Sequence, residues 1–144
     1  MKTLVFFLGL ALLETAPQGT SQTESLCTVL ADAALHDGSV VTVEGVYLRV
    51  PHGSIITAPD CSLSPRAVAN VRLAADFRQK DRVMKTLWSL TEKQKPVKVV
   101  LKGTLHVAKK EQGFGQGVEP YEIEVVKYLA AEPYIEHSPD QPKP

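Results

Sequence analysis

The segment 39–50 constrains the fold of this chain more than any other part of the sequence. Valine supplies five of its twelve residues, and branched side chains favour extended backbone. Gly45 lies near the middle of the segment, where the missing side chain permits a bulge or a sharp bend. Closing a small sheet into a barrel requires a strand that bends and thereby serves both halves of the barrel. The segment therefore predicts a long, bent strand in a closed β structure.

The other segments with a periodic pattern predict the order of strands and helices along the chain. Three strands are expected first, at 39–50, 54–58 and 67–74. The one strongly amphipathic helix follows at 78–93, and two further strands at 97–107 and 121–129. This order is typical of a mainly β protein with one helix, folded as a five-stranded OB-like barrel. The alternative is an α+β fold in which an antiparallel sheet packs on one helix.

The expected helix has one apolar side, formed by residues that recur every three or four positions. Leu87, Trp88 and Leu90 are predicted to plug one end of the barrel with this side. A shorter helical spacing covers 23–34 and contains Cys27. With Trp88 assigned to the core, the aromatic residues left for the surface are Tyr47, Phe114 and Tyr128.

The first residues have the pattern of a secretory signal peptide. Lys2 precedes an uninterrupted apolar run of ten residues at 4–13, whereas a membrane-spanning helix needs about 20. Cleavage after Ser21 is expected, and no other segment is long and apolar enough to span a bilayer. The predicted organisation is a signal peptide at 1–21, one domain at 22–131 and a disordered, proline-rich tail at 132–144. The mature protein is expected to be secreted or periplasmic.

The two cysteines of the chain, Cys27 and Cys61, both lie in the predicted mature domain. In an oxidising compartment an isolated pair of cysteines is most simply a disulfide. The alternative, a metal site, is disfavoured because no further cysteine or histidine stands at a ligand spacing from them.

A resemblance supports the same conclusion. Cys27, the Asp37-Gly38 turn before the strand Val40–Gly45, and Cys61 together resemble small exported bacterial proteins with an OB-like domain that are functionally uncharacterised. The similar region covers about a third of the chain. The resemblance implies the fold and the disulfide and implies no activity.

The charges of the chain are balanced. Lys+Arg and Asp+Glu both number 16, so the formal net charge is zero. A neutral domain has no long-range field that attracts phosphates, which disfavours nucleic acid as a partner. On the last two strands, Lys98 and Lys102 are expected to pair with Glu122 and Glu124. We therefore expect a mixed surface without a basic stripe.

No pattern in the sequence indicates catalysis or metal binding. None of the four histidines has a ligand partner at a suitable spacing. Ser62 and Ser64 lack the Gly-x-Ser-x-Gly context of a hydrolase nucleophile. The glycine-rich segment 113–117 precedes a strand instead of a helix, which indicates a flexible hairpin loop and argues against a phosphate site. We expect no catalytic residue, no metal and no cofactor.

These observations favour an exported, non-enzymatic OB-like domain that binds a protein, a glycan or a small ligand. Two alternatives remain, namely a hydrolase without a recognisable motif and a structural protein of the cell envelope. OB barrels bind their ligands between the turn after the first strand and the loop before the last strand. The residues assigned to that surface are Tyr47, Arg49, His52 and Phe114.

Overall fold

The computed structural model describes residues 22–63, 67–109, 112–115 and 119–136. The predicted signal peptide at 1–21 and the last eight residues of the predicted tail lie outside these residues. None of the helices within the described ranges has the length and apolar character that crossing a bilayer requires. In chain order the elements are β1 (Glu24–Ser25), α1 (Leu26–Ala31), α2 (Ala33–His36), β2 (Val40–Val50), β3 (Gly53–Thr57), β4 (Val68–Leu73), α3 (Arg82–Glu92), β5 (Val97–Val107) and β6 (Tyr121–Pro133).

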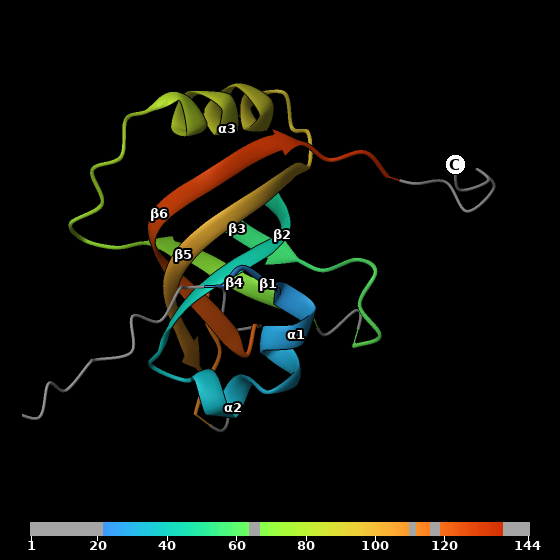
Figure 1. The fold of residues 1–144 in the computed structure, drawn as a ribbon, viewed down its shortest axis with the longest axis vertical. Coiled ribbons are helices and arrows are strands. Elements are labelled where there is room, and N and C mark those ends of the chain that lie inside the picture. The colour runs from blue at the N-terminus through green and yellow to red at the C-terminus, as the bar shows by residue number, and fades with distance from the viewer. Residues whose placement is uncertain (1–21, 64–66, 110–111, 116–118, 137–144) are drawn as a thin grey trace, which may run out of the picture.

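The strands close into a barrel (Figure 1). β2, β3 and β4 are antiparallel neighbours, β4 pairs in parallel with β6, and β6 pairs antiparallel with β5. An antiparallel pairing of β5 with β2 completes the ring. The short β1 is an additional strand, parallel to β2. The predicted mainly β, five-stranded barrel is therefore confirmed, with three short helices instead of one.

β2 joins the two halves of the barrel. Its residues 40–47 pair with β5, and its residues 46–50 pair with β3. Gly45 lies just before this change of partner, and a Cβ atom there would stand 2.8 Å from Cγ1 of Ile56. Any side chain at this position would collide with the core. The close approach of β3 explains why a glycine interrupts a segment otherwise rich in valine.

Helices cover the two ends of the barrel (Figure 1). At one end, α1 and α2 contact β2 and β5 and bury Leu26, Val29 and Leu30. The predicted disulfide is present and joins Cys27 of α1 to Cys61 in the segment after β3. At the other end, α3 packs on β6 through Met84 and Leu87.

The largest differences between predicted and observed boundaries are at the start of α3 and the end of β6. α3 begins at Arg82 instead of residue 78, because the side chain of Asp81 accepts a hydrogen bond from the backbone N–H of Met84 and caps the helix. β6 runs to Pro133, two residues beyond the domain end expected at 131. The partner strand accounts for the extension, since Val97 at the start of β5 pairs with Pro133.

Candidate functional site

A groove of about 250 Å³ opens between α3 and the hairpin of β2 and β3. We call it the α3 groove. Residues of the barrel rim and of the helix face line it, and the lining combines aromatic, aliphatic and hydroxyl side chains with one cation. The residues on which the site depends are Tyr47, Arg49, Ser54, Leu73, Trp88 and Tyr128.

Two tyrosines form the floor of the α3 groove. Tyr128 is 1% exposed, and its ring meets that of Tyr47 edge to face at a centroid distance of 6.2 Å. Burial raises the pKa of the Tyr128 phenol far above its ordinary value, so this group stays protonated. The Tyr47 hydroxyl donates a hydrogen bond of 2.5 Å to Oγ of Ser54. The floor is thus an apolar surface with hydroxyl groups at its edge.

Trp88 forms a wall of the α3 groove, and its predicted place in the core is wrong. The side chain is 49% exposed, whereas Leu87 is buried. The buried positions of α3 are Met84, Leu87 and Thr91. Trp88 lies one turn after Met84, at the edge of this buried face. The predicted surface position of Tyr128 is also wrong, since its side chain is buried in the core.

The hairpin brings two of the four predicted ligand residues to the α3 groove. Tyr47 lines it, but its ring is buried, so only its edge is available to a ligand. Arg49 lines it with an exposed side chain and pairs with Ser54 across the two strands. His52 is exposed at the turn between two residues of the lining, Pro51 and Gly53.

Phe114 lies at a different surface. It is half-buried in a shallow pocket on the outer wall of the barrel, together with Arg72 and His106. Side chains alternate between the two faces of a strand, so on β4 the outward Arg72 contributes to this pocket while Leu73 contributes to the α3 groove. Sequence order alone places Phe114 beside the first hairpin, but the barrel wall separates the two pockets.

The outer pocket contains a network of paired charges. Glu122 is buried, although an exposed position was expected, and it accepts hydrogen bonds from Asn70 (2.8 Å) and Arg72 (3.0 Å). Arg72 also pairs with Glu124, and these bonds raise the pKa of its guanidinium above the ordinary value. Within the described part of the chain, every buried side-chain nitrogen or oxygen has a partner. The network therefore joins β4 to β6 and leaves no buried group to act on a ligand.

A third and larger hollow, of about 820 Å³, lies beside the disulfide and the end of β6. Its cation, Lys98, already has Glu44 at 3.5 Å and Glu132 at 3.7 Å. Across the described residues, no group of three or more His, Cys, Asp or Glu side chains stands where it could hold a metal ion. Arg49, the cation of the α3 groove, forms no ion pair with a described residue, so we take the α3 groove as the candidate site.

Comparisons of the chain with protein-family models, with curated proteins and with solved structures gave no match. The resemblance noted in the sequence is accordingly supported only at the level of a small, five-stranded mixed β-barrel. The interpretation of the α3 groove rests on its own geometry.

Proposed function

We propose that this protein is an exported, non-enzymatic binding domain of the OB type, and that its α3 groove binds a segment of a glycan. The observation on which the proposal rests is that the half-exposed indole of Trp88 lines the same groove as the hydroxyl-bearing side chains of Tyr47 and Ser54. A domain without a binding role would gain stability by burying the indole in the core.

The order of the elements supports the OB type. An OB barrel has a first strand that pairs with both the second and the fourth, and β2 pairs here with β3 and β5. The helix between the third and fourth barrel strands corresponds to α3. The parallel pair of β4 and β6 joins the third barrel strand to the fifth.

Export is supported by two independent features. The apolar run at 4–13 has the length of a signal-peptide core. The disulfide between Cys27 and Cys61 fits an oxidising compartment, since such bonds are rare in the cytosol. Each feature would be unusual in a protein that stays in the cytoplasm.

The chemistry of the α3 groove favours a sugar ring. A pyranose has apolar faces, which can stack on the Trp88 indole, and hydroxyl groups at its edge, which can bond to Ser54 and Arg49. Ligand pockets for drug-sized molecules have volumes of roughly 300–1,000 Å³. At about 250 Å³ the α3 groove accommodates one small group of a longer molecule. A chain of sugars lying across the rim supplies such a group.

The same lining argues against the hydrolase alternative. General acid–base catalysis needs a side chain that can accept a proton near neutral pH, most often histidine or a carboxylate. The described lining of the α3 groove contains no His, Asp, Glu or Cys. The Ser54 hydroxyl bonds to the hydroxyl of Tyr47, which is a poor base for activating a nucleophile.

A glycan array probed with the purified chain tests the proposal, followed by a titration of Trp88 fluorescence with each glycan retained. Trp88 is the only tryptophan of the chain, so the emission reports on the surroundings of this one residue. Arg49→Ala is expected to weaken binding about tenfold or more, through loss of a charge-assisted hydrogen bond of roughly 1.5–3 kcal/mol. Trp88→Ala is expected to abolish retention on the array.

Phe114→Ala is the matched control, because it removes an aromatic side chain from the outer pocket and leaves the α3 groove intact. Binding of a glycan that is equally strong in Trp88→Ala contradicts the site. If no glycan binds the chain and the α3 groove binds a peptide instead, the proposal that the ligand is a glycan is contradicted.

A further inference from the structure

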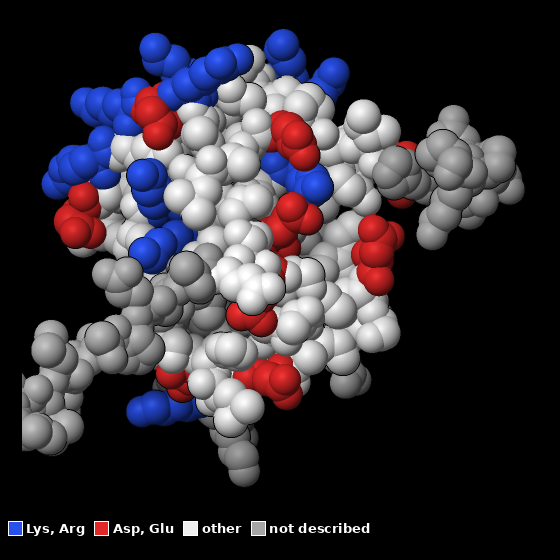
Figure 2. Space-filling model, in the orientation of Figure 1, with Lys and Arg blue, Asp and Glu red and all other residues white. Residues whose placement is uncertain are grey.

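Charge is unevenly distributed over this neutral chain. The segment 78–95, which contains α3, has six basic and two acidic residues. The other described residues comprise six basic and eleven acidic residues. Figure 2 shows the consequence, with Lys and Arg gathered over α3 and the loop before it, and acidic residues spread over the middle and lower parts of the view. The balanced net charge therefore conceals a molecule with one basic end.

The cations at this end are exposed, and one of them, Arg78, donates hydrogen bonds to the backbone carbonyls of Ala75 and Phe77. All six are exposed, namely Arg78, Lys80, Arg82, Lys85, Lys93 and Lys95. In the part of the chain that the structure describes, the lysines and arginines that form ion pairs are Arg72 and Lys98, both on barrel strands outside this segment. The carboxylate of Asp81 is engaged by Gln79 and by the N–H of Met84. Little negative charge therefore compensates the positive charge of the segment 78–95.

Two further lysines lie opposite each other on the wall of the barrel. Lys102 lies opposite Lys127 across β5 and β6, and Lys98 lies opposite Glu132. The prediction that Lys98 and Lys102 pair with Glu122 and Glu124 is therefore wrong. Two register shifts in this strand pair produce the juxtaposition. Like charges directly opposite each other destabilise a sheet. A cost of this kind is offset when an anionic partner lies against both side chains.

Trp88 adds an apolar group at the edge of this basic surface. It lies one turn after Lys85 on α3 and is half exposed, as is Leu73 on the neighbouring rim. Tryptophan beside lysine and arginine is typical of helices that lie at the interface between a membrane and water. The indole enters the headgroup region, while the cations contact lipid phosphates.

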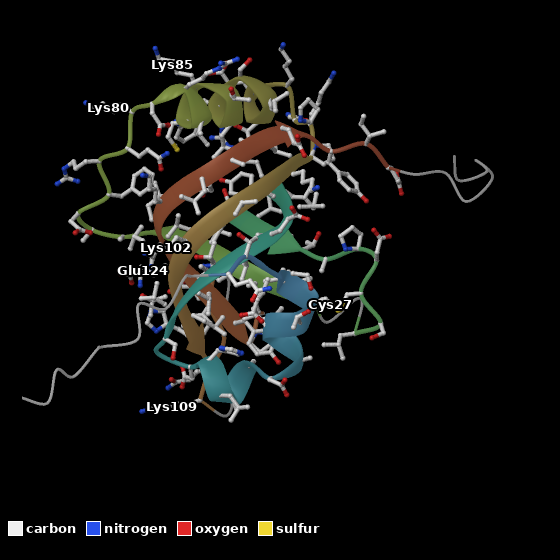
Figure 3. All side chains as sticks on the ribbon, viewed as in Figure 1. Cys27, Lys80, Lys85, Lys102, Lys109 and Glu124 are labelled. Carbon is white, nitrogen blue, oxygen red and sulfur yellow. A yellow bond between two sulfur atoms is a disulfide. The ribbon has the colours of Figure 1, made fainter. Side chains whose placement is uncertain are left out.

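From this combination we infer that α3 docks on the surface of an anionic phospholipid membrane, with the cations on the phosphate groups and Trp88 inserted among the headgroups. An extended, flat partner fits this surface, because α3 lies at one end of the molecule (Figure 1) and Lys80 and Lys85 point away from the barrel there (Figure 3). The acidic remainder is repelled by the same membrane and orients the domain. The inference goes beyond the proposed glycan binding and does not depend on it.

Co-sedimentation with vesicles tests the inference. The probes are vesicles of phosphatidylcholine alone and vesicles that also contain phosphatidylglycerol, with Trp88 emission recorded in parallel. The chain is expected to bind only the anionic vesicles, with a blue shift of the emission, and added salt is expected to release it. Lys85→Gln is expected to weaken binding about fivefold, and Arg82→Gln with Lys85→Gln more than tenfold.

Lys109→Gln is the matched control, since Lys109 is an exposed lysine at the opposite end of the molecule from Lys85 (Figure 3). The inference is overturned if both vesicle types bind equally, if neither binds at low salt, or if Lys109→Gln weakens binding as much as Lys85→Gln. It is also overturned if heparin, a soluble polyanion, binds the chain and the anionic vesicles do not. Vesicle binding with no glycan bound supports the docking and contradicts the glycan proposal, so the two failures are distinguishable.

Discussion

The two ends of the barrel are closed in different ways. At the α1 and α2 end, Leu26 and Val29 are fully buried, and the disulfide from Cys27 fixes α1 to the segment after β3. At the α3 end, Met84 and Leu87 are buried, but Trp88 remains half exposed over a groove. Each end also exposes an apolar residue, Leu35 on α2 and Trp88 on α3, but of these two only Trp88 lines one of the hollows described above. This difference is the reason why we propose the α3 end as the binding end.

α3 is also held by polar groups that its sequence pattern does not reveal. Gln79, in the loop before the helix, donates to the carbonyl of Tyr128 and accepts from its N–H, both at 2.7 Å. The side-chain amide thereby bonds to β6 as a neighbouring strand would. Phe77 packs edge to face on Tyr128 at a centroid distance of 6.1 Å. The loop that carries α3 is therefore anchored on the floor of the groove.

The sharpest comparison at the α3 end is between its two large aromatic residues. Tyr128→Ala is expected to lower the free energy of unfolding by about 3 to 5 kcal/mol, because it leaves a cavity under the groove. Trp88→Ala is expected to lower it by about 1 kcal/mol or less, since half of the indole is already in water. Urea unfolding of the disulfide-bonded chain measures both values.

Tyr128→Phe serves as the control for Tyr128→Ala, because it removes the hydroxyl and keeps the ring. Tyr128→Phe is expected to lower the free energy of unfolding by much less than Tyr128→Ala does. If Trp88→Ala destabilises the chain as much as Tyr128→Ala, then the indole belongs to the core and the contrast between the ends is lost.

Removing the disulfide, at the α1 and α2 end of the barrel, is expected to have the next largest effect on stability. Its two cysteines are 34 residues apart, and the chain-entropy model assigns a bond closing a loop of that length about 3 to 4 kcal/mol. Replacing both cysteines by serine is expected to reduce stability by this amount. Glycan and vesicle binding of the remaining folded fraction are expected to be unchanged, because neither cysteine lines the α3 groove. Reduced affinity at full folding would show that the two ends are coupled.

The fold was largely predictable from the sequence, because strand segments and glycine positions follow local rules. The segment 97–107 matches β5 at both ends, and Gly45 marks the change of partner in β2. β6 was expected to be shorter, since its last four residues form a strand only because β5 lies beside them. Long-range pairing of this kind leaves no local signal.

The candidate site was less predictable, because the residues that form it are determined by the face of the barrel wall to which each side chain points. Trp88 satisfies the spacing rule for a buried helix position, and only the actual rotation of α3 on β6 moves it to the rim. Phe114 and Tyr47 flank the same predicted surface in sequence order, yet they lie on opposite faces of the barrel wall. Helix rotation and strand facing are decided by the packing of the whole barrel.

The smallest predicted effect compares the caps of the two helices. Ser25 caps α1 by accepting from the N–H of Thr28 at 3.1 Å, and a hydroxyl does not titrate in the acid range. Asp81 caps α3, and hydrogen bonds from Gln79 and then from the N–H of Met84 lower the pKa of its carboxyl below the ordinary 3.8. A lowered pKa in the folded state means that the ionised cap stabilises α3 above pH 4 or so, and that this contribution is lost as the pH falls through the folded-state pKa.

Hydrogen exchange measured between pH 5 and about pH 2 should therefore show protection of the Met84 amide falling relative to that of the Thr28 amide. Asp81→Asn keeps a capping oxygen without a titrating group, so the difference between the two amides should become independent of pH. Acid loosening of α3 that persists unchanged in Asp81→Asn would assign the effect to other carboxylates. Loss of protection at both caps together would mean that the two ends unfold as one unit, and the contrast between them would then be one of surface chemistry alone.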